Sequence, residues 1–100
     1  MTNTLSFESF EAAALARGFD EVQPRSWASD TVVESHAHPF AVEALVVQGE
    51  MWLTVGETTC HLLPGDTFEL TRERPHSERY GAEGATYWAA RRHGTPVAPY

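Results

Sequence analysis

The sequence has little cysteine, no lysine and no long apolar run. Its single cysteine, Cys60, has no second cysteine in the chain with which to form a disulfide, which fits a reducing compartment. No apolar segment approaches the length needed to cross a membrane, and the opening stretch MTNTLSFESF lacks the cationic and apolar regions of a secretory signal. We therefore expect a cytoplasmic protein with no membrane partner.

Positive charge is also scarce. Seven basic residues, all of them arginines, stand against 14 acids, and the net charge is -7. A protein that binds nucleic acid must supply cations to displace the counterions condensed on the phosphates, so this balance predicts no DNA or RNA partner. A chain of 100 residues makes one small domain with limited buried surface. Because aromatic side chains such as Trp52 exceed what one small interior needs, we predict a homodimer.

The N-terminal part of the chain predicts one short α-helix. Ser6 is a typical N-cap, acidic residues follow it in the first turns, and Gly18 is a typical C-terminal stop. Phe7 and Phe10 begin an apolar stripe at helical spacing. The segment 6–18 is therefore expected to cover one sheet or to brace a partner subunit.

Short alternating runs separated by turn residues follow the helix. The predicted strands are Val22–Ala28, Thr31–His36, Val42–Gln48, Met51–Val55, Thr58–Leu63, Thr67–Thr71, Ser77–Tyr80 and Ala85–Arg91. Eight short strands with tight connections predict an all-β fold, an antiparallel double-stranded β-helix of the jelly-roll type over residues 22–92. No linker or repeat interrupts it, so the chain is predicted to be a single domain over residues 1–100.

The alternation within the strands predicts which side chains face the barrel interior. Met51 and Leu53 share the predicted inner face, and Trp52 faces outward. An outward indole indicates an oligomer contact, or else a surface that the helix covers. Near the end of the chain, two aromatic rows alternate, one with Tyr87 and one with Trp88. The pattern leaves open which of these rows faces inward.

The stretch His36-Ala37-His38 concentrates the candidate chemistry. Two histidines one residue apart on an extended segment point the same way, so their imidazoles can share one ion. Imidazole binds zinc, copper, iron and nickel, and a carboxylate often completes such a site. Glu43 is the nearest acid downstream. Two strand histidines are by themselves a weak signal of a metal site.

The second half of the chain strengthens this interpretation, because His76 follows Gly65 by eleven residues. With this spacing the sequence resembles the cupin superfamily, whose first motif is G-x5-H-x-H-x3,4-E-x6-G and whose second is G-x5-P-x-G-x2-H-x3-N. His36 and His38 match the histidine pair, and Gly49 matches the closing glycine. Gly65 opens the second motif, and His76 stands where the third histidine belongs. The resemblance covers residues 25–92 and implies the cupin barrel.

The sequence departs from both cupin motifs at five positions. Asp30 replaces the opening glycine of the first motif, and Val42 stands where the family has its glutamate. In the second motif, Thr71 replaces the proline, Glu73 the second glycine and Tyr80 the asparagine. More than one acidic residue could therefore be the fourth ligand of the implied metal site.

Two acids compete for that place. Glu43 lies one residue late, and a slip of one residue turns a side chain to the opposite face unless a bulge at 39–41 resets the phase. Glu78 is in phase with His76 two residues earlier. Because the family places its acid on the first motif, the three histidines with Glu43 are the expected metal ligands. Glu78 is the expected catalytic, substrate-facing acid, and water or an exchange of these two roles stays an alternative.

Other reactive residues lie outside the motifs. His61 and His93 fit no ligand spacing, so surface or interface roles are expected. Cys60 is expected to be a small buried apolar residue. Arg91 and the other arginines of the second half are expected to be surface charges or ion-pair partners for the acidic excess.

The resemblance implies one fold but does not imply one function, because cupins include both enzymes and binding proteins. Our first hypothesis is a metal-dependent enzyme of dioxygenase, isomerase or lyase type, with one divalent manganese, iron, nickel, copper or zinc ion acting on a small oxygen-bearing molecule. The alternative is a sensor or binding module with the same pocket and no turnover. A metal-free structural barrel is the third reading, because the first motif lacks its glutamate.

Overall fold

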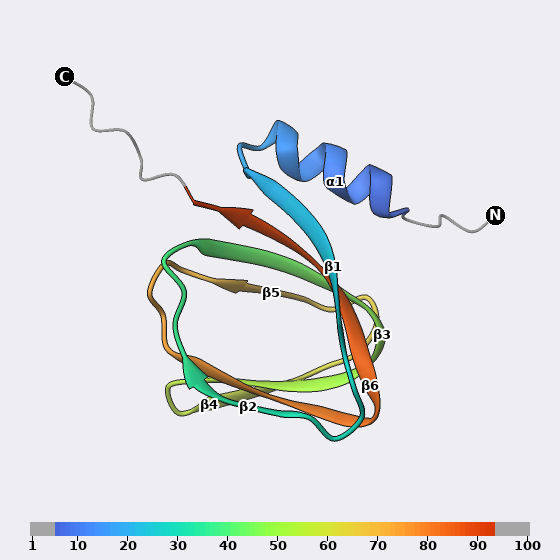
Figure 1. The fold of residues 1–100 in the computed structure, drawn as a ribbon, viewed down its shortest axis with the longest axis vertical. Coiled ribbons are helices and arrows are strands. Elements are labelled where there is room, and N and C mark those ends of the chain that lie inside the picture. The colour runs from blue at the N-terminus through green and yellow to red at the C-terminus, as the bar shows by residue number, and fades with distance from the viewer. Residues whose placement is uncertain (1–5, 94–100) are drawn as a thin grey trace.

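One helix precedes six strands in the structure, a computed structural model that describes residues 6–93. The elements are α1 (Phe7–Ala16), β1 (Glu21–Trp27), β2 (Val32–His36), β3 (Ala41–Val55), β4 (Thr58–Leu62), β5 (Thr67–Leu70) and β6 (His76–Arg92) (Figure 1). Every strand pair is antiparallel. The predicted all-β class with one short N-terminal helix is confirmed.

The two long strands, β3 and β6, take part in both layers of the barrel. Residues 41–49 of β3 lie opposite residues 85–92 of β6, and residues 51–54 lie opposite residues 77–80. β1 and β5 flank the first of these blocks, whereas β2 and β4 flank the second. The result is the predicted double-layered barrel, whose two layers enclose the interior in Figure 1.

Two turns predicted from glycine residues are instead bends within continuous strands. β3 runs through Gly49, and β6 runs through 81–84, so four predicted strands are two long ones. The φ of Gly49 is +79°, and a Cβ added there would lie 2.1 Å from the carbonyl oxygen of Gly84. A Cβ on Gly84 would in turn lie 2.2 Å from the carbonyl oxygen of Trp27. Three backbone segments meet at this corner, where only glycine fits without strain.

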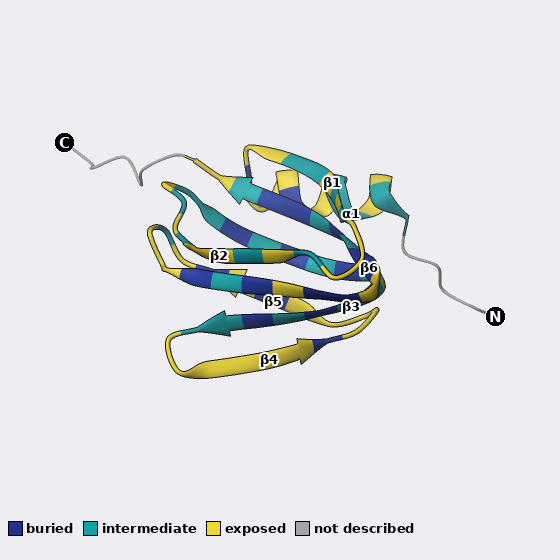
Figure 2. Ribbon diagram, turned by 60° about the horizontal axis from the view of Figure 1, so that its bottom comes forward, coloured by how far each residue is buried: buried dark blue, intermediate teal, exposed yellow. Residues whose placement is uncertain are grey.

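Buried apolar side chains from the two layers fill the barrel. The main cluster comprises Val42, Ala44, Val46, Met51, Leu53, Leu62, Phe68, Leu70, Tyr80, Ala85, Tyr87 and Ala89. Figure 2 shows the alternation of buried and partly exposed residues along β3. Met51 and Leu53 are buried as predicted. Of the two aromatic rows in β6, the row with Tyr87 faces inward.

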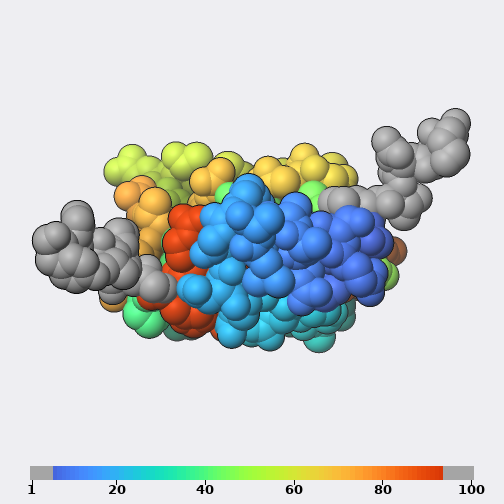
Figure 3. All heavy atoms as spheres, turned by 90° about the horizontal axis from the view of Figure 1, so that it is seen from above, coloured from blue at the N-terminus to red at the C-terminus, as the bar shows by residue number. Residues whose placement is uncertain are grey.

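The helix packs on the outside of the barrel. The ring of Phe7 lies 5.5 Å from that of Trp88, and the ring of Phe10 lies 5.8 Å from it. Ala14 and Ala90 are fully buried in the same outer cluster. Figure 3 shows α1 together with β1 over one side of the molecule. No helix among residues 6–93 is long and apolar enough to cross a membrane.

Trp52 faces outward as predicted, but the helix does not cover it. Its indole stacks on His61 at a centroid distance of 4.7 Å, and the guanidinium carbon of Arg79 lies 4.0 Å from its ring centre. The neighbouring strand β4 pairs with β3 alone among the described residues and is mostly exposed (Figure 2). Cys60 lies on this edge strand and is exposed, so the expectation that it is buried was wrong.

Candidate metal centre

Three histidines meet at one end of the barrel, where β2 ends and β6 begins. His36 closes β2, His76 opens β6 directly opposite it, and His38 lies two residues after the end of β2. One ligand nitrogen from each of the three lies within 4.8 Å of the other two. The structure therefore brings together the three histidines that the motif spacing selected. Metal binding by them stays a prediction.

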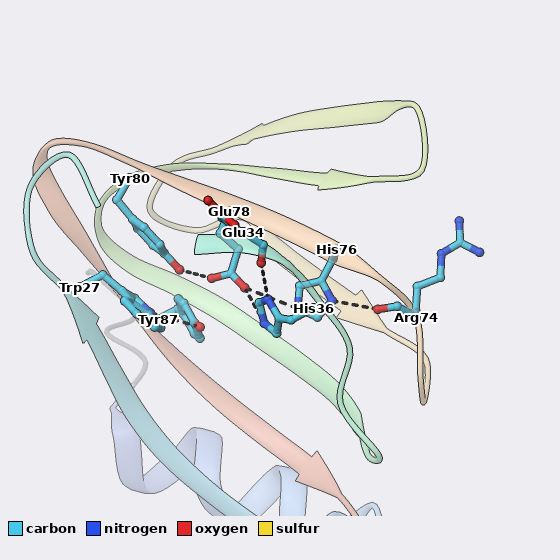
Figure 4. A network of polar contacts seen from close by, with 8 residues as sticks. All are labelled: Trp27, Glu34, His36, Arg74, His76, Glu78, Tyr80 and Tyr87. Carbon is cyan, nitrogen blue, oxygen red and sulfur yellow. Dashed lines mark hydrogen bonds and ion pairs between the residues drawn. The ribbon is translucent and has the colours of Figure 1, made fainter. Parts of the chain in front are cut away.

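Backbone carbonyl groups fix the orientation of two of these rings. Nδ1 of His36 lies 2.8 Å from the carbonyl oxygen of Glu34, and Nδ1 of His76 lies 2.9 Å from that of Arg74 (Figure 4). A carbonyl oxygen only accepts, so Nδ1 carries the proton in both rings. Nε2 then presents a lone pair in the neutral ring, as in metal-ligating histidines whose other nitrogen donates to a carbonyl.

Glu78 joins the histidines from within the barrel. Its carboxylate is buried, and its Oε2 lies 3.4 Å from Nε2 of His76 and 3.8 Å from Nε2 of His36. Nε2 of His76 is itself buried and has no hydrogen-bond partner among residues 6–93. A lone pair on each nitrogen and a carboxylate oxygen converge, and such acceptors repel one another unless a cation or a proton lies between them. The donor set fits a divalent transition metal.

The third histidine is held in its neutral form. Burial first, and then repulsion from His36, His76, Arg91 and Arg25 in that order, together lower the pKa of His38 to about 4. The ring stacks on Phe40 at a centroid distance of 4.8 Å. A neutral imidazole at neutral pH is the form that coordinates a metal.

A chain of aromatic donors extends from the carboxylate into the barrel. The hydroxyl of Tyr80 donates to Oε1 of Glu78, and the indole nitrogen of Trp27 donates to the hydroxyl of Tyr87 at 3.3 Å (Figure 4). Burial raises the pKa of both tyrosines, so both hydroxyls keep their protons at neutral pH. Neither tyrosine was predicted from the sequence to support the site. Extending the period of two from His76 through Glu78 would have reached Tyr80.

Glu43 is not at this site, and its expected place beside the histidines was wrong. The neighbouring Val42 is buried opposite Leu70, so the phase of β3 turns Glu43 to the outer face. There Oε1 of Glu43 lies 2.7 Å from Nη1 of Arg17. No bulge after Pro39 restores the family's pattern. Glu78, the in-phase acid, is the carboxylate that lies with the histidines.

Two non-glycine residues keep the backbone shape of the motif glycines that they replace. The φ of Asp30 is 57° and that of Glu73 is 62°, both in the left-handed region that glycine adopts most easily. The amide of Glu73 donates to the carbonyl oxygen of His38 at 2.7 Å. The loop before β6 therefore ties the second motif to the first.

A small cavity lies beside the histidines. Its volume is about 90 Å³, well below the roughly 300 Å³ at which drug-sized pockets begin. The histidine cluster and Glu78 line one part, and apolar groups such as Val42 and Leu70 line another. Arg25 and Arg91 also line it. Arg91 was expected to be a surface charge or an ion-pair partner, and it does pair with Glu21 at 3.2 Å. Arg25 was not singled out from the sequence.

The other two histidines lie away from the cavity. Nε2 of His61 lies 2.6 Å from Oε2 of Glu50, and Nε2 of His93 lies 3.2 Å from Oε1 of Glu21. Both histidines are largely exposed and lie outside the cluster of ligand nitrogens. Their exposure agrees with the surface or interface roles expected from the sequence.

Comparison with known proteins identifies a family and one related regulator. The family described as AraC-like ligand binding domain matches the chain over residues 24–91. Over 38 residues the chain is 50% identical to an HTH-type transcriptional regulator of Haemophilus influenzae, a match that covers 38% of this chain and 13% of that protein.

Solved structures of cupins superpose on the barrel. A structure of DMSP lyases has a TM-score of 0.68 at 19% identity and matches 79% of this chain and 40% of its own. An RmlC-like cupin from Shewanella frigidimarina has a TM-score of 0.62 at 20% identity, covering 70% and 63% of the two chains. An HTH_3 family transcriptional regulator from Vibrio cholerae has a TM-score of 0.65 at 17% identity, covering 80% and 46%. These likenesses show the fold alone.

Proposed function

This chain belongs to the AraC-like ligand-binding domain family and has the cupin fold, and we propose that its barrel binds one divalent transition metal together with a small oxygen-bearing molecule. One observation carries the proposal. Nε2 of His76 is buried, has no hydrogen-bond partner among residues 6–93 and faces a buried carboxylate oxygen of Glu78. A lone pair in that setting is costly unless a metal cation or a proton satisfies it, and the convergence of two further imidazoles on the same point favours the metal.

The residues that would hold the metal are the three histidines, with Oε2 of Glu78 as a fourth donor. Manganese, iron, nickel, copper and zinc all accept such a mixed nitrogen and oxygen set. When bound, the ion would supply Lewis acidity that polarises an oxygen atom of the ligand. The carbonyl groups that accept from His36 and His76 would keep both rings turned to it.

Tyr80 and Trp27 position the acid and the wall of the cavity. The hydroxyl of Tyr80 holds Oε1 of Glu78, which leaves Oε2 directed at the histidines. The rings of Trp27 and Tyr80 stack at 5.3 Å, and the indole nitrogen of Trp27 holds the hydroxyl of Tyr87.

Ligand sensing is the use of this site that the family match supports. The family is described as a ligand-binding domain, and the relative is a transcriptional regulator. The balance of 7 basic residues against 14 acids still predicts that this chain does not bind nucleic acid. A gel-shift assay with duplex DNA checks that prediction at low salt, where electrostatic binding is strongest.

Turnover is the second candidate, and the position of Glu78 favours it. In that case the three histidines alone would hold the ion, and Oε2 of Glu78, which lies beside both the histidines and the cavity, would take a proton from a bound molecule while Tyr80 keeps its own proton. The similar folds include lyases and a polyketide cyclase. Steady formation of product, lost in Glu78→Gln with the fold intact, would support catalysis. Retention of a ligand without product would support sensing.

Elemental analysis tests the metal proposal directly. Protein purified without a chelator is expected to carry roughly one divalent transition metal per chain if binding is tight. Metal-depleted protein should take the ion up again on titration. A content below about a tenth of an equivalent, with no uptake of manganese, iron, nickel, copper or zinc, would contradict the proposal.

A further inference from the structure

Two arginine side chains face the barrel interior, an unusual position for a group that is rarely buried without a partner. Arg25 lies directly opposite Tyr87 in the pairing of β1 with β6. Arg91 lies directly opposite Val42 in the pairing of β3 with β6. Tyr87 and Val42 are buried core residues, and directly opposite residues of an antiparallel pair share a face. Both guanidinium groups therefore belong to the inner face, where they line the cavity.

Aromatic rings hold both guanidinium groups in place. The guanidinium carbon of Arg25 lies 5.5 Å from the ring centre of Trp27, and that of Arg91 lies 4.7 Å from the ring centre of Phe40. Such stacking restricts the long side chains before any ligand arrives. A site with fixed donors loses less conformational entropy on binding than a site with mobile ones.

The positive charge at this end of the cavity is only partly balanced. Nη1 of Arg91 lies 3.2 Å from Oε1 of Glu21, an exposed carboxylate that water screens. Among residues 6–93, no carboxylate lies within ion-pair distance of Arg25. In a chain with a net charge of -7, two of seven cations are thus directed at one cavity.

We propose that the molecule bound beside the histidines is a short-chain organic acid whose carboxylate is held by Arg25 and Arg91. This assignment rests on the function proposed above and names the class of its ligand. The fork of a guanidinium matches a carboxylate through two parallel hydrogen bonds. Val42 and Leu70 give the cavity an apolar wall for the hydrocarbon part, and a volume of about 90 Å³ suits an acid of a few carbon atoms.

Propionate and its neutral isostere propionamide are the probes that test this assignment. Chelator-treated and metal-loaded samples of the full chain are titrated with each at low ionic strength, and the Kd is taken from amide chemical shifts. We expect propionate to bind at least about tenfold more tightly than propionamide, because hydrogen bonds to a charged acceptor are roughly twice as strong as neutral ones. Inorganic phosphate is titrated as a competing anion without an apolar part.

Matched variants assign the preference to the two arginines. Arg25→Gln and Arg91→Gln should each reduce the preference for propionate, whereas Arg79→Gln removes the same charge from the outer face beside Trp52 and should keep it. Arg25→Lys keeps the charge without the fork and should restore part of the preference. Amide spectra of each variant establish that the fold is kept.

The outcomes separate this inference from the metal proposal. A preference for propionate in chelator-treated protein that takes up no metal would support the arginine site and contradict the metal. Metal uptake with equal affinity for propionate and propionamide would overturn the arginine site. Binding that Arg25→Gln and Arg91→Gln weaken no more than Arg79→Gln would also overturn it, as would phosphate binding more tightly than propionate.

Discussion

Nε2 of His76 lies 3.4 Å from Oε2 of Glu78, two residues further along the same strand, and both groups are buried. The carbonyl oxygen of Arg74 holds a proton of this imidazole on Nδ1, so in the neutral ring the facing nitrogen carries a lone pair. The hydroxyl of Tyr80 occupies the other carboxylate oxygen. The strand period of two thus directs a nitrogen and an oxygen donor to one point, which is the geometric basis of the predicted metal centre.

Exchange of one carboxylate for an amide distinguishes the two acids. Glu78→Gln is expected to weaken metal binding by about 10 to 100-fold or more, because it removes an anionic oxygen from the donor set. Glu43→Gln is the matched control, since that carboxylate faces Arg17 on the outer surface. It should leave metal affinity unchanged and lower stability by at most about 1 kcal/mol. Competition with a coloured chelator measures the affinities, and equal effects of the two changes would contradict the assignment.

Removal of one imidazole tests the histidine cluster. His76→Ala should lower metal affinity at least about 100-fold, because it deletes a donor that the barrel holds in place from the opening of β6. His61→Ala is the control, since His61 stacks on Trp52 outside the barrel. Elemental analysis after gel filtration gives the metal content of both. Full loading of His76→Ala would contradict a metal centre built on this side chain.

Deletion of one hydroxyl tests the support of Glu78 from within the barrel. Tyr80→Phe keeps the ring stacked on Trp27 and removes the donor to Oε1 of Glu78. The free energy of unfolding of metal-free protein should fall by about 1 to 3 kcal/mol, because a buried acceptor loses its partner. Urea unfolding measures the change. An unchanged midpoint would show that water replaces the hydroxyl at no cost.

The sequence predicts the inward face of the barrel well, because strand alternation is a local property. Met51 and Leu53 are buried, and the in-phase relation of His76 and Glu78 holds in three dimensions. The same rule, applied strictly, places Glu43 outside. Glu43 was expected at the site because the family's motif places its acid there. In the structure the strand register, and not the motif, determines which acid lies beside the histidines.

Other features depend on contacts that no local pattern contains. Gly49 is typical of a turn in sequence, yet β3 continues through it because the backbone of Gly84 approaches it closely. Arg25 faces the cavity because β1 pairs with β6 in one particular register, with Tyr87 opposite. Trp88 lies on the outer face of β6, where Phe7 and Phe10 of α1 pack on it. This contact decides which of the two aromatic rows faces outward, and strand alternation alone does not.

The homodimer stays a prediction, but the structure weakens the argument from exposed aromatic side chains. Trp52 lies between His61 and Arg79, and Trp88 lies under the helix, so both indoles are covered within one chain. We still expect a dimer in sedimentation velocity at micromolar concentration. Trp52→Glu should weaken it if the outer face of β3 takes part. A single monomeric species at that concentration would contradict the prediction.

The corner formed by Gly49 gives the sharpest test of the fold itself. A Cβ at Gly49 would lie 2.1 Å from the carbonyl oxygen of Gly84, whereas a Cβ at Gly65 would meet no atom within 4 Å. Both residues have positive φ, at +79° and +98°, so alanine strains the backbone at either position. The comparison therefore separates the cost of the clash from the cost of the backbone conformation.

Gly65→Ala is expected to lower the free energy of unfolding by about 1 to 2 kcal/mol, the cost of the left-handed backbone for a residue with a side chain. Gly49→Ala adds the displacement of β6 from β3 and should cost about 2 to 5 kcal/mol in all. Against a total of roughly 5 to 15 kcal/mol for a small domain, the second change approaches global unfolding. Urea midpoints with an unchanged slope measure both. Equal losses would show that the approach of Gly49 to Gly84 relaxes freely and does not define the bend between the two layers.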